Sequence, residues 1–221
     1  MEIQKQSIGQ RVVGVVVRVV LFSAVLAGIA WLIGLEANLG SGNDTLYSED
    51  SLTEYLQIGC MGLLIAVCMV WGSRDKAQQP VAVLLAGFAL IALIREMDSF
   101  LDHNVFDGAW QVLALISVAT VLTMTWRYRN ALPGALDVFL NHWTFGIVLS
   151  GFLTTFVFSR MFGRKVFWKA VMSEHYIRSV KNVAEEGVEL LGYALILIGS
   201  LDYIYGRLRL KNRHDHSGMP E

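Results

Sequence analysis

Acidic side chains lie at the ends of three apolar segments of this chain, where they could act together. Glu54 lies near the start of one segment, residues 96–103 place acids and a histidine at the end of the next, and residues 185–189 open a third. Charges near hydrocarbon are costly and usually mark a functional site, and neighbouring carboxylates also repel one another. A bound cation would remove both costs. The cluster therefore predicts a metal site, whose oxygen and imidazole donors suit one or two divalent ions of zinc, iron, manganese, magnesium or calcium.

Six apolar stretches are the elements that must position these acids. Of the 221 residues, 54% are hydrophobic and 17% are charged, which is unlike an ordinary soluble domain. A transmembrane helix needs about 20 mostly apolar residues. The stretches of this kind are approximately residues 12–35, 52–71, 81–100, 110–126, 136–158 and 183–205. We expect an all-α, polytopic integral membrane protein, a bundle of six transmembrane helices forming one domain over residues 1–221. Its other parts would be short cytoplasmic tails at 1–10 and 207–221 and an interfacial segment at about 160–174.

Basic residues indicate the orientation of the six helices, because lysine and arginine concentrate on the cytoplasmic side. The positions that agree with one another are Lys5, Arg11, Arg74, Lys76, Arg127, Arg129, Arg207, Arg209, Lys211 and Arg213. Six crossings place all of them on one face. Both termini are therefore expected to be cytoplasmic, in a plasma membrane or bacterial inner membrane, with the loop at 36–50 outside. One basic segment, 160–181, disagrees with the others, because this topology places it on the outer side of the membrane. Its mixture with Phe167 and Trp168 suits either a helix in the headgroup layer or a solvated loop.

This topology brings the acids to one depth, near the outer interface, where the second and sixth predicted helices start and the third ends. The expected metal ligands are Glu54, Glu96, His103, His175, Glu185, Glu186 and Glu189, and which of Glu185 and Glu186 faces the site is open. The residues expected beside these ligands are Gln57, Arg95, Asp98, Asp102, Arg178 and Asn182. The sixth helix is expected to begin near Ser173. A step of about 100° per residue then gathers the polar positions from His175 to Tyr193 into one stripe.

Several of these acids also have a structural interpretation. The sequence Ser51-x-x-Glu54 fits a capping box at a helix start. The acids at 185–186 could be favourable partners of a helix N-terminal dipole. Arg95 could pair with an aspartate of its own segment. The Glu-x-x-His signature of carboxylate-bridged metal bundles is absent from the sequence.

Three functions are consistent with this pattern. The first is a metal-dependent membrane enzyme, a hydrolase or oxidoreductase, acting on a lipid or other amphiphile that enters from the outer leaflet. Glu189 and Tyr193 would be its catalytic residues, with Tyr193 donating to developing charge. The second is a transporter that carries protons or cations on the acids. The third is a structural or partner-binding protein whose acids pair with Arg95, Arg178 and Lys181. Membrane lipids are the expected partners, and a net charge of −1 argues against nucleic acid.

Polar residues near the cytoplasmic end predict a second, simpler contact. Arg18 is expected at the depth of Asp202 and of a group formed by Asp137, Asn141 and His142. A buried charge must be paired to be tolerated. A pair of Arg18 with an aspartate explains these residues more simply than a second functional site does.

Overall fold

The computed structural model describes residues 8–39 and 51–217, and the regular structure in these two ranges is all helical. The expected outer loop at 36–50 is helical over 36–39, where α1 continues, and its residues 40–50 lie outside the described residues, as do the chain ends at 1–7 and 218–221. Within the described ranges, six segments are long and apolar enough to cross a membrane. They are Ile8–Glu36, Leu52–Arg74, Gln79–Glu96, Ala109–Arg127, Thr144–Phe162 and Arg178–Lys211. The predicted all-helical fold with six apolar spans is confirmed, and it is compatible with a membrane protein.

Helices of very different lengths make up the described chain. The α-helices are α1 (Ile8–Leu39), α2 (Leu52–Arg74), α3 (Gln79–Glu96), α4 (Asp98–Asn104), α5 (Ala109–Arg127), α6 (Leu132–Leu140), α7 (Thr144–Leu153), α8 (Ser159–Phe162), α9 (Lys165–Met172) and α10 (Arg178–Ser217). A π-helix, η1 (Thr154–Phe158), joins α7 to α8, and a short 3-10 helix, η2 (Ser173–His175), follows α9. The segment α7–η1–α8 forms the fifth span.

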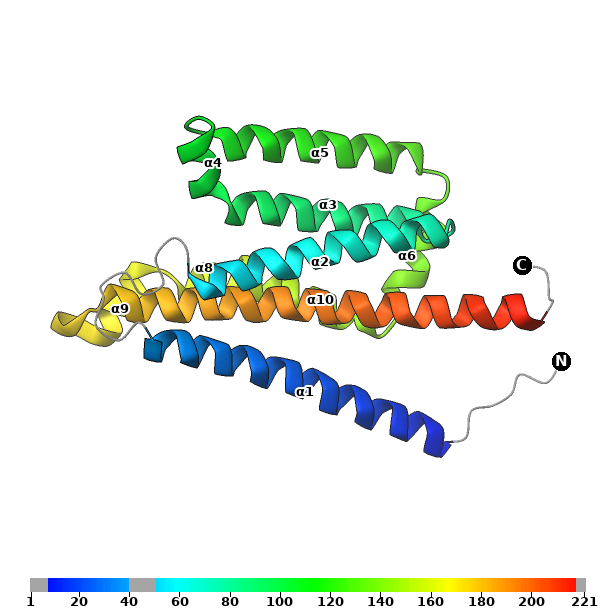
Figure 1. The fold of residues 1–221 in the computed structure, drawn as a ribbon, viewed down its shortest axis with the longest axis horizontal. Coiled ribbons are helices and arrows are strands. Elements are labelled where there is room, and N and C mark those ends of the chain that lie inside the picture. Colours follow the sequence, from blue (N-terminus) through cyan, green and yellow to red (C-terminus); the bar gives the residue numbers. More distant parts are fainter. Residues whose placement is uncertain (1–7, 40–50, 218–221) are drawn as a thin grey trace.

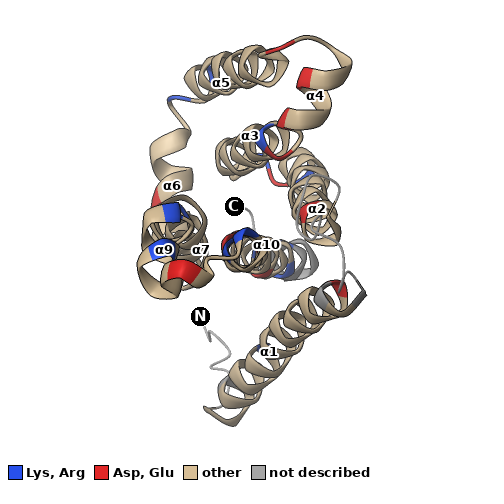
Figure 2. Ribbon diagram, turned by 90° about the vertical axis from the view of Figure 1, so that its left-hand side faces the viewer, with Lys and Arg blue, Asp and Glu red and all other residues tan. Residues whose placement is uncertain are grey.

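Helix α10 lies between α1 and α2, and α3 and α5 lie farther from it, beyond α2 (Figure 1). It packs against α2, α7, η1 and α8, while α2 packs on α3 and α3 packs on α5. Seen from the end of the bundle, α1 and α5 lie at the outside (Figure 2). The buried apolar core includes Met61, Leu64, Trp71, Ala89, Ile196 and Tyr203. Close packing of such side chains is what holds helices together in an apolar solvent.

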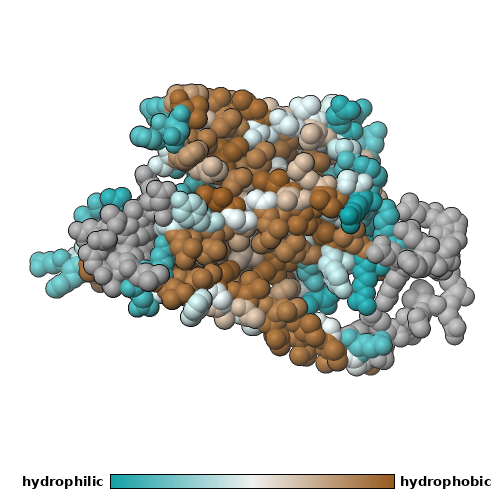
Figure 3. All heavy atoms as spheres, in the orientation of Figure 1, coloured by the Kyte–Doolittle hydropathy of each residue, from teal (hydrophilic) through white to brown (hydrophobic). Residues whose placement is uncertain are grey.

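A broad apolar band separates two polar ends of the molecule on the face shown in Figure 3. Large aliphatic side chains are exposed on the outer helices, for example Val16 and Val20 of α1 and Leu115 and Leu122 of α5. Contiguous apolar surface of this extent is unfavourable in water and is what a helix presents to lipid. The apolar surface and the lengths of the six spans are therefore both compatible with a membrane protein.

Two predicted ends of helices are wrong. Helix α3 stops at Glu96, and Met97 separates it from α4, so the predicted span 81–100 is interrupted. Helix α10 begins at Arg178 instead of Ser173, because η2 ends at His175 and the chain is extended at Tyr176. His175 therefore does not belong to the polar stripe of α10. The helix continues to Ser217, so most of the expected C-terminal tail is helical.

The predicted fifth helix, 136–158, is divided between α6 and α7. At the break the Asn141 side chain donates to the backbone carbonyl of Asp137 at 2.9 Å. His142 Nδ1 lies 2.8 Å from the Thr144 hydroxyl and 3.4 Å from the Thr144 amide nitrogen, which donates to it. Polar side chains that bond to nearby backbone compete with the helix in this way. The break thus has a local cause that hydrophobicity alone does not reveal.

Glycine allows α7 and α10 to approach closely. A Cβ atom added at Gly151 would lie 2.6 Å from the carbonyl oxygen of Gly192 and 2.8 Å from the backbone nitrogen of Ile196. No side chain fits at such distances, so this crossing requires glycine. The approach also brings η1 and α8, which follow α7, against the first turns of α10.

Candidate functional site

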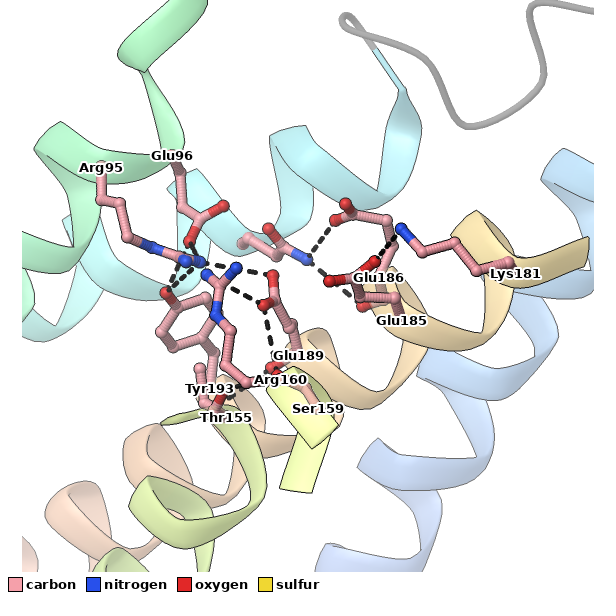
Figure 4. A network of polar contacts seen from close by, with 11 residues as sticks. Arg95, Glu96, Thr155, Ser159, Arg160, Lys181, Glu185, Glu186, Glu189 and Tyr193 are labelled. Atoms are coloured by element: carbon pink, nitrogen blue, oxygen red, sulfur yellow. Dashed lines mark hydrogen bonds and ion pairs between the residues drawn. The ribbon is translucent and has the colours of Figure 1, made fainter. Parts of the chain in front are cut away.

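Polar side chains from α2, α3, η1, α8 and α10 meet at the end of the bundle where α10 begins (Figure 4). We name this group the ionic network. Its members are Gln57, Arg95, Glu96, Thr155, Ser159, Arg160, Lys181, Glu185, Glu186, Glu189 and Tyr193. These contacts bring together the start of α2, through Gln57, the end of α3 and the first half of α10.

Glu189 lies at the centre of the ionic network and is only 4% exposed. Its Oε2 is 3.3 Å from Arg95 Nη2 of α3, and its Oε1 is 3.3 Å from Arg160 Nη2 of α8. Ser159 Oγ also donates to Oε1 at 3.2 Å. The hydroxyl of Thr155 donates to the backbone carbonyl of Glu189 at 3.4 Å. Both carboxylate oxygens are thus bound by guanidinium groups from two different helices, α3 and α8.

Glu96 is bound by Arg95 and by Tyr193. The Tyr193 hydroxyl donates to Glu96 Oε1 at 2.6 Å, and Arg95 forms an ion pair with the same oxygen. Arg95 Nη2 also lies 3.5 Å from the Tyr193 oxygen. The Tyr193 side chain is fully buried, and its hydroxyl is directed at a carboxylate. This arrangement stabilises a buried acid and does not by itself provide a free proton donor for a substrate.

Glu185 and Glu186 point in different directions from α10. Glu185 pairs with Lys181 one turn earlier and lies against Gly163 of the α8–α9 connection. Glu186 faces α2, where Gln57 Nε2 donates to its Oε2 at 3.1 Å and to its backbone carbonyl at 3.2 Å. Glu186, not Glu185, therefore faces the bundle. Among the described residues, no basic side chain lies within ion-pair distance of Glu186.

The ionic network has one more acid than it has bases. Its carboxylates are Glu96, Glu185, Glu186 and Glu189, and its bases are Arg95, Arg160 and Lys181. With every group ionised, one negative charge is left over. Glu186 is the acid of the network that has no basic partner within it. Its carboxylate accepts a hydrogen bond from the neutral amide of Gln57. Such a charge inside a bundle is unfavourable unless a cation or a proton joins it.

The predicted metal ligands do not all come together. His103 and His175 are exposed and belong to α4 and η2. Within the described ranges, no group of three or more histidine, cysteine, aspartate or glutamate side chains is arranged to hold a metal ion. The physical reason is that arginines take the places a metal would occupy at Glu96 and Glu189. The metal site, with its one or two divalent ions, stays a prediction from the sequence.

The other predicted site residues have local partners or lie at the surface. Ser51 is the N-cap of α2, and its hydroxyl accepts from the Glu54 amide at 3.1 Å, which is one of the two bonds of the predicted capping box. Asp98 accepts from the amide of the next residue, and Asp102 accepts from the Gly108 amide at 3.1 Å. Arg178 is exposed at the start of α10. The pairing of Arg95 with an aspartate of its own segment is replaced by the pairs with Glu96 and Glu189.

Sequence reasoning missed Thr155, Ser159 and Arg160 as members of the site. Thr155 and Ser159 are four residues apart, one helical turn, and Arg160 follows directly at the end of an apolar span. This spacing places all three at the depth of Glu189, which is the signal that could have found them. Glu36 was missed as well. It binds the Leu52 and Thr53 amides at 2.8 and 3.1 Å and so caps α2 from the end of α1.

A second polar group occupies the opposite end of α10. Arg18 Nε lies 3.0 Å from Asp202 Oδ1, which confirms the predicted pairing of Arg18 with an aspartate. Tyr203 donates to Gln78 Oε1 at 2.8 Å. Burial lowers the pKa of His142 below the ordinary histidine value; Asp202 opposes this shift, while Arg18 and Arg207 add to it. Together with the His142 ring, whose centroid lies 5.1 Å from that of Tyr203, the contacts of Arg18 and Gln78 connect the α6–α7 break, α1 and the N-cap of α3 to α10.

No protein-family model, curated protein or solved structure matches the chain. The geometry of its own side chains is therefore what points to a function.

Proposed function

We propose that this chain is an integral membrane protein that takes up a proton at the ionic network, as a proton-coupled transporter does. The observation that carries the proposal is the environment of Glu186, an acid on the inner side of α10 that is held by an amide and by no base of the described network. Adding one proton removes the excess negative charge of the network. Glu96, Glu185 and Glu189 each have a basic partner, so the unpaired negative charge of the network belongs to Glu186.

Gln57 provides a partner for the protonated form of Glu186. Its amide nitrogen donates to the ionised carboxylate, while its Oε1 is buried and has no hydrogen-bond partner among the described residues. A protonated carboxyl group carries an O–H donor, which needs an acceptor. Rotation of the Gln57 amide would bring Oε1 to this donor. The same side chain can therefore bind Glu186 in both protonation states, with a different atom in each.

An apolar layer separates the ionic network from the polar group at the other end of α10. Met61, Leu64, Ala89 and Ile196 are fully buried in the core between the two ends. A proton carrier requires a barrier of this kind, because a continuous polar path would let protons leak across. Release to the other face would require the helices to move, which is how carriers alternate between faces.

Infrared difference spectroscopy on the purified protein in lipid nanodiscs tests the proton site. Titration should produce the C=O band of a protonated carboxyl group, and Glu186→Gln should remove this band. Glu185→Gln is the matched control, because it changes the neighbouring acid of the same helix while Glu186 remains. A band that persists in Glu186→Gln would exclude Glu186 as the proton acceptor. Proton flux into proteoliposomes tests transport separately, and equal flux in wild type and Glu186→Gln would exclude the transporter assignment.

A structural role is the second candidate, and the crossed ion pairs of Glu189 favour it. Arg95 attaches α3 to Glu189, and Arg160 attaches α8 to the same carboxylate. Such pairs fix how helices are arranged even where they add little stability. If this is the whole role of the network, Arg95→Gln should loosen the bundle while Glu186→Gln changes neither proton binding nor flux.

A further inference from the structure

Helix α9 and the residue before it form a basic and apolar segment at the end of the bundle (Figure 1). Every side chain of α9 is at least partly exposed. The helix is held to the rest of the protein by Trp168, whose indole nitrogen donates to the carbonyl of Phe162 at 2.8 Å. The Trp168 ring also packs edge-on against the Phe162 ring, with 5.2 Å between the centroids. These contacts fix which face of α9 is directed away from the bundle.

The outward face of α9 is apolar. Val166 is 74% exposed, Val171 is 62% exposed and Phe167 is 44% exposed. With a step of about 100° per residue, these three side chains and Ala170 share one arc of the helix. Trp168 and Met172 lie on the opposite side and are partly buried. An eight-residue helix with such a face would be unstable in water and is suited to the boundary between headgroups and acyl chains.

The remaining face of α9 is basic. Lys165 and Lys169 lie one turn apart, between the packed side and the apolar arc, and Arg164 is the N-cap residue. All three are exposed, and within the described chain none of them forms an ion pair. Glu174 is the nearest acid along the chain, so the segment from 164 to 174 keeps an excess of positive charge. A basic face beside an apolar face matches an anionic lipid surface.

We infer that α9 lies in the headgroup layer of the membrane and binds anionic phospholipids. Val166, Phe167 and Val171 insert at the acyl boundary, and Arg164, Lys165 and Lys169 bind the phosphate groups. Helix α9 ends at its C-cap residue Ser173, which has a positive φ of 52°, so the chain changes direction before α10 begins. A soluble acidic protein would satisfy the bases but would leave Val166 and Val171 without an apolar partner. Phe167 packs one side of its ring near Phe162, with 5.5 Å between the centroids, and is still 44% exposed.

Spin labels measure the depth of α9 in the full chain. A label at Val166→Cys and a label at Lys165→Cys, each in a Cys60→Ala/Cys68→Ala background, would be compared in vesicles of phosphatidylcholine and phosphatidylglycerol. The label at 166 should relax more strongly with oxygen, which concentrates in lipid, and the label at 165 with a water-soluble reagent. If the label at 166 behaves like a water-exposed one, α9 does not lie in the membrane and a solvated segment or a protein-binding segment replaces the proposal.

Charge removal tests the preference for anionic lipid. The labelled Val166→Cys protein should move several-fold toward the lipid-exposed signal when phosphatidylglycerol is added to phosphatidylcholine, and Arg164→Gln/Lys165→Gln/Lys169→Gln should abolish this response. Arg127→Gln/Arg129→Gln is the control, since it removes bases at the other end of the bundle and should leave the response intact. A label that is inserted to the same depth with and without phosphatidylglycerol would overturn the anionic-lipid preference.

Discussion

Gln57 of α2 and Glu186 of α10 are joined by two hydrogen bonds from one nitrogen atom. Gln57 Nε2 donates to the Glu186 backbone carbonyl at 3.2 Å and to the Glu186 carboxylate at 3.1 Å. The bond to the carbonyl does not depend on the charge of Glu186, whereas the bond to the carboxylate does. The pair thus couples a helix–helix contact to the protonation of a single acid. Protonation of Glu186 would therefore change a hydrogen bond at the start of α2.

Removal of Arg95 should destabilise the protein strongly, because Glu96 loses its basic partner and Glu189 loses one of its two guanidinium partners. Breaking a buried ion pair costs about 3–5 kcal/mol, and partial exposure of Arg95 reduces the expected loss for Arg95→Gln to about 2–3 kcal/mol. The double variant Arg95→Gln/Glu189→Gln should lose less than the sum of the single variants, because the ion pair between these two residues can be lost only once. Unfolding in detergent by stepwise denaturant addition measures each free energy.

Arg178→Gln is the control for the Arg95 variants. Arg178 is exposed at the start of α10, and an exposed substitution of this kind usually changes stability by less than about 0.5 kcal/mol. Equal losses for Arg95→Gln and Arg178→Gln, or additive losses in the double variant, would show that the ion pair with Glu189 does not form in the membrane.

Gly151→Ala should destabilise the crossing of α7 and α10. The added methyl group would meet backbone atoms of Gly192 and Ile196, which cannot move independently of the helix. Overpacking of this type costs about 1–3 kcal/mol. Gly146→Ala in the same helix is the matched control, because a methyl group there has open space and should add up to about 1 kcal/mol of helix propensity. A thermal shift of the same sign in both variants would contradict the close approach.

The six spans were predictable because their length and apolar content are local properties of the sequence. The breaks inside them were not. Met97 separates α3 from α4 within the predicted span 81–100, and the Asn141–His142 break separates α6 from α7 within the predicted span 136–158. At the second break, side chains bond to the local backbone in place of the helix. The sequence contains both residues, but whether they cap or continue a helix depends on packing around them.

The depth of the site residues along their helices could be predicted, but not which side chains pair with one another. Counting residues from each helix end gives the depth of a side chain, so Glu96 and Glu189 were expected at one level. Which residues meet at that level depends on how each helix is rotated about its axis, and this rotation is set by contacts such as Gly151 against Gly192. Composition places Arg160 in the basic segment after the fifth span, whereas its guanidinium in fact reaches Glu189.

Acidification should lower the stability of the fold through His142. Burial lowers the pKa of this imidazole in the folded state, so the unfolded chain binds the proton more readily. The stability from neutral His142 is present above about pH 6.5, the ordinary histidine value, and is lost as the pH falls through the lowered pKa. His142→Gln should remove this part of the pH dependence. The difference in melting temperature between wild type and variant, measured from about pH 7.5 to about pH 5, gives the result. A difference that does not change with pH would contradict the shift.

Metal analysis of the purified protein separates the proton site from the metal site that the sequence predicts. Arginines bind both oxygens of Glu189 and also bind Glu96. A divalent ion would have to displace these guanidinium groups or bind in spite of their repulsion. With the network in this arrangement, we expect much less than one tightly bound ion per chain by elemental analysis after dialysis. Metal ligation also requires ionised carboxylates, so any bound ion should be released on acidification. One or two ions per chain that disappear in Glu189→Gln but remain in Glu185→Gln would show that the carboxylates leave their arginines for a metal, and the proton site would then have to be given up.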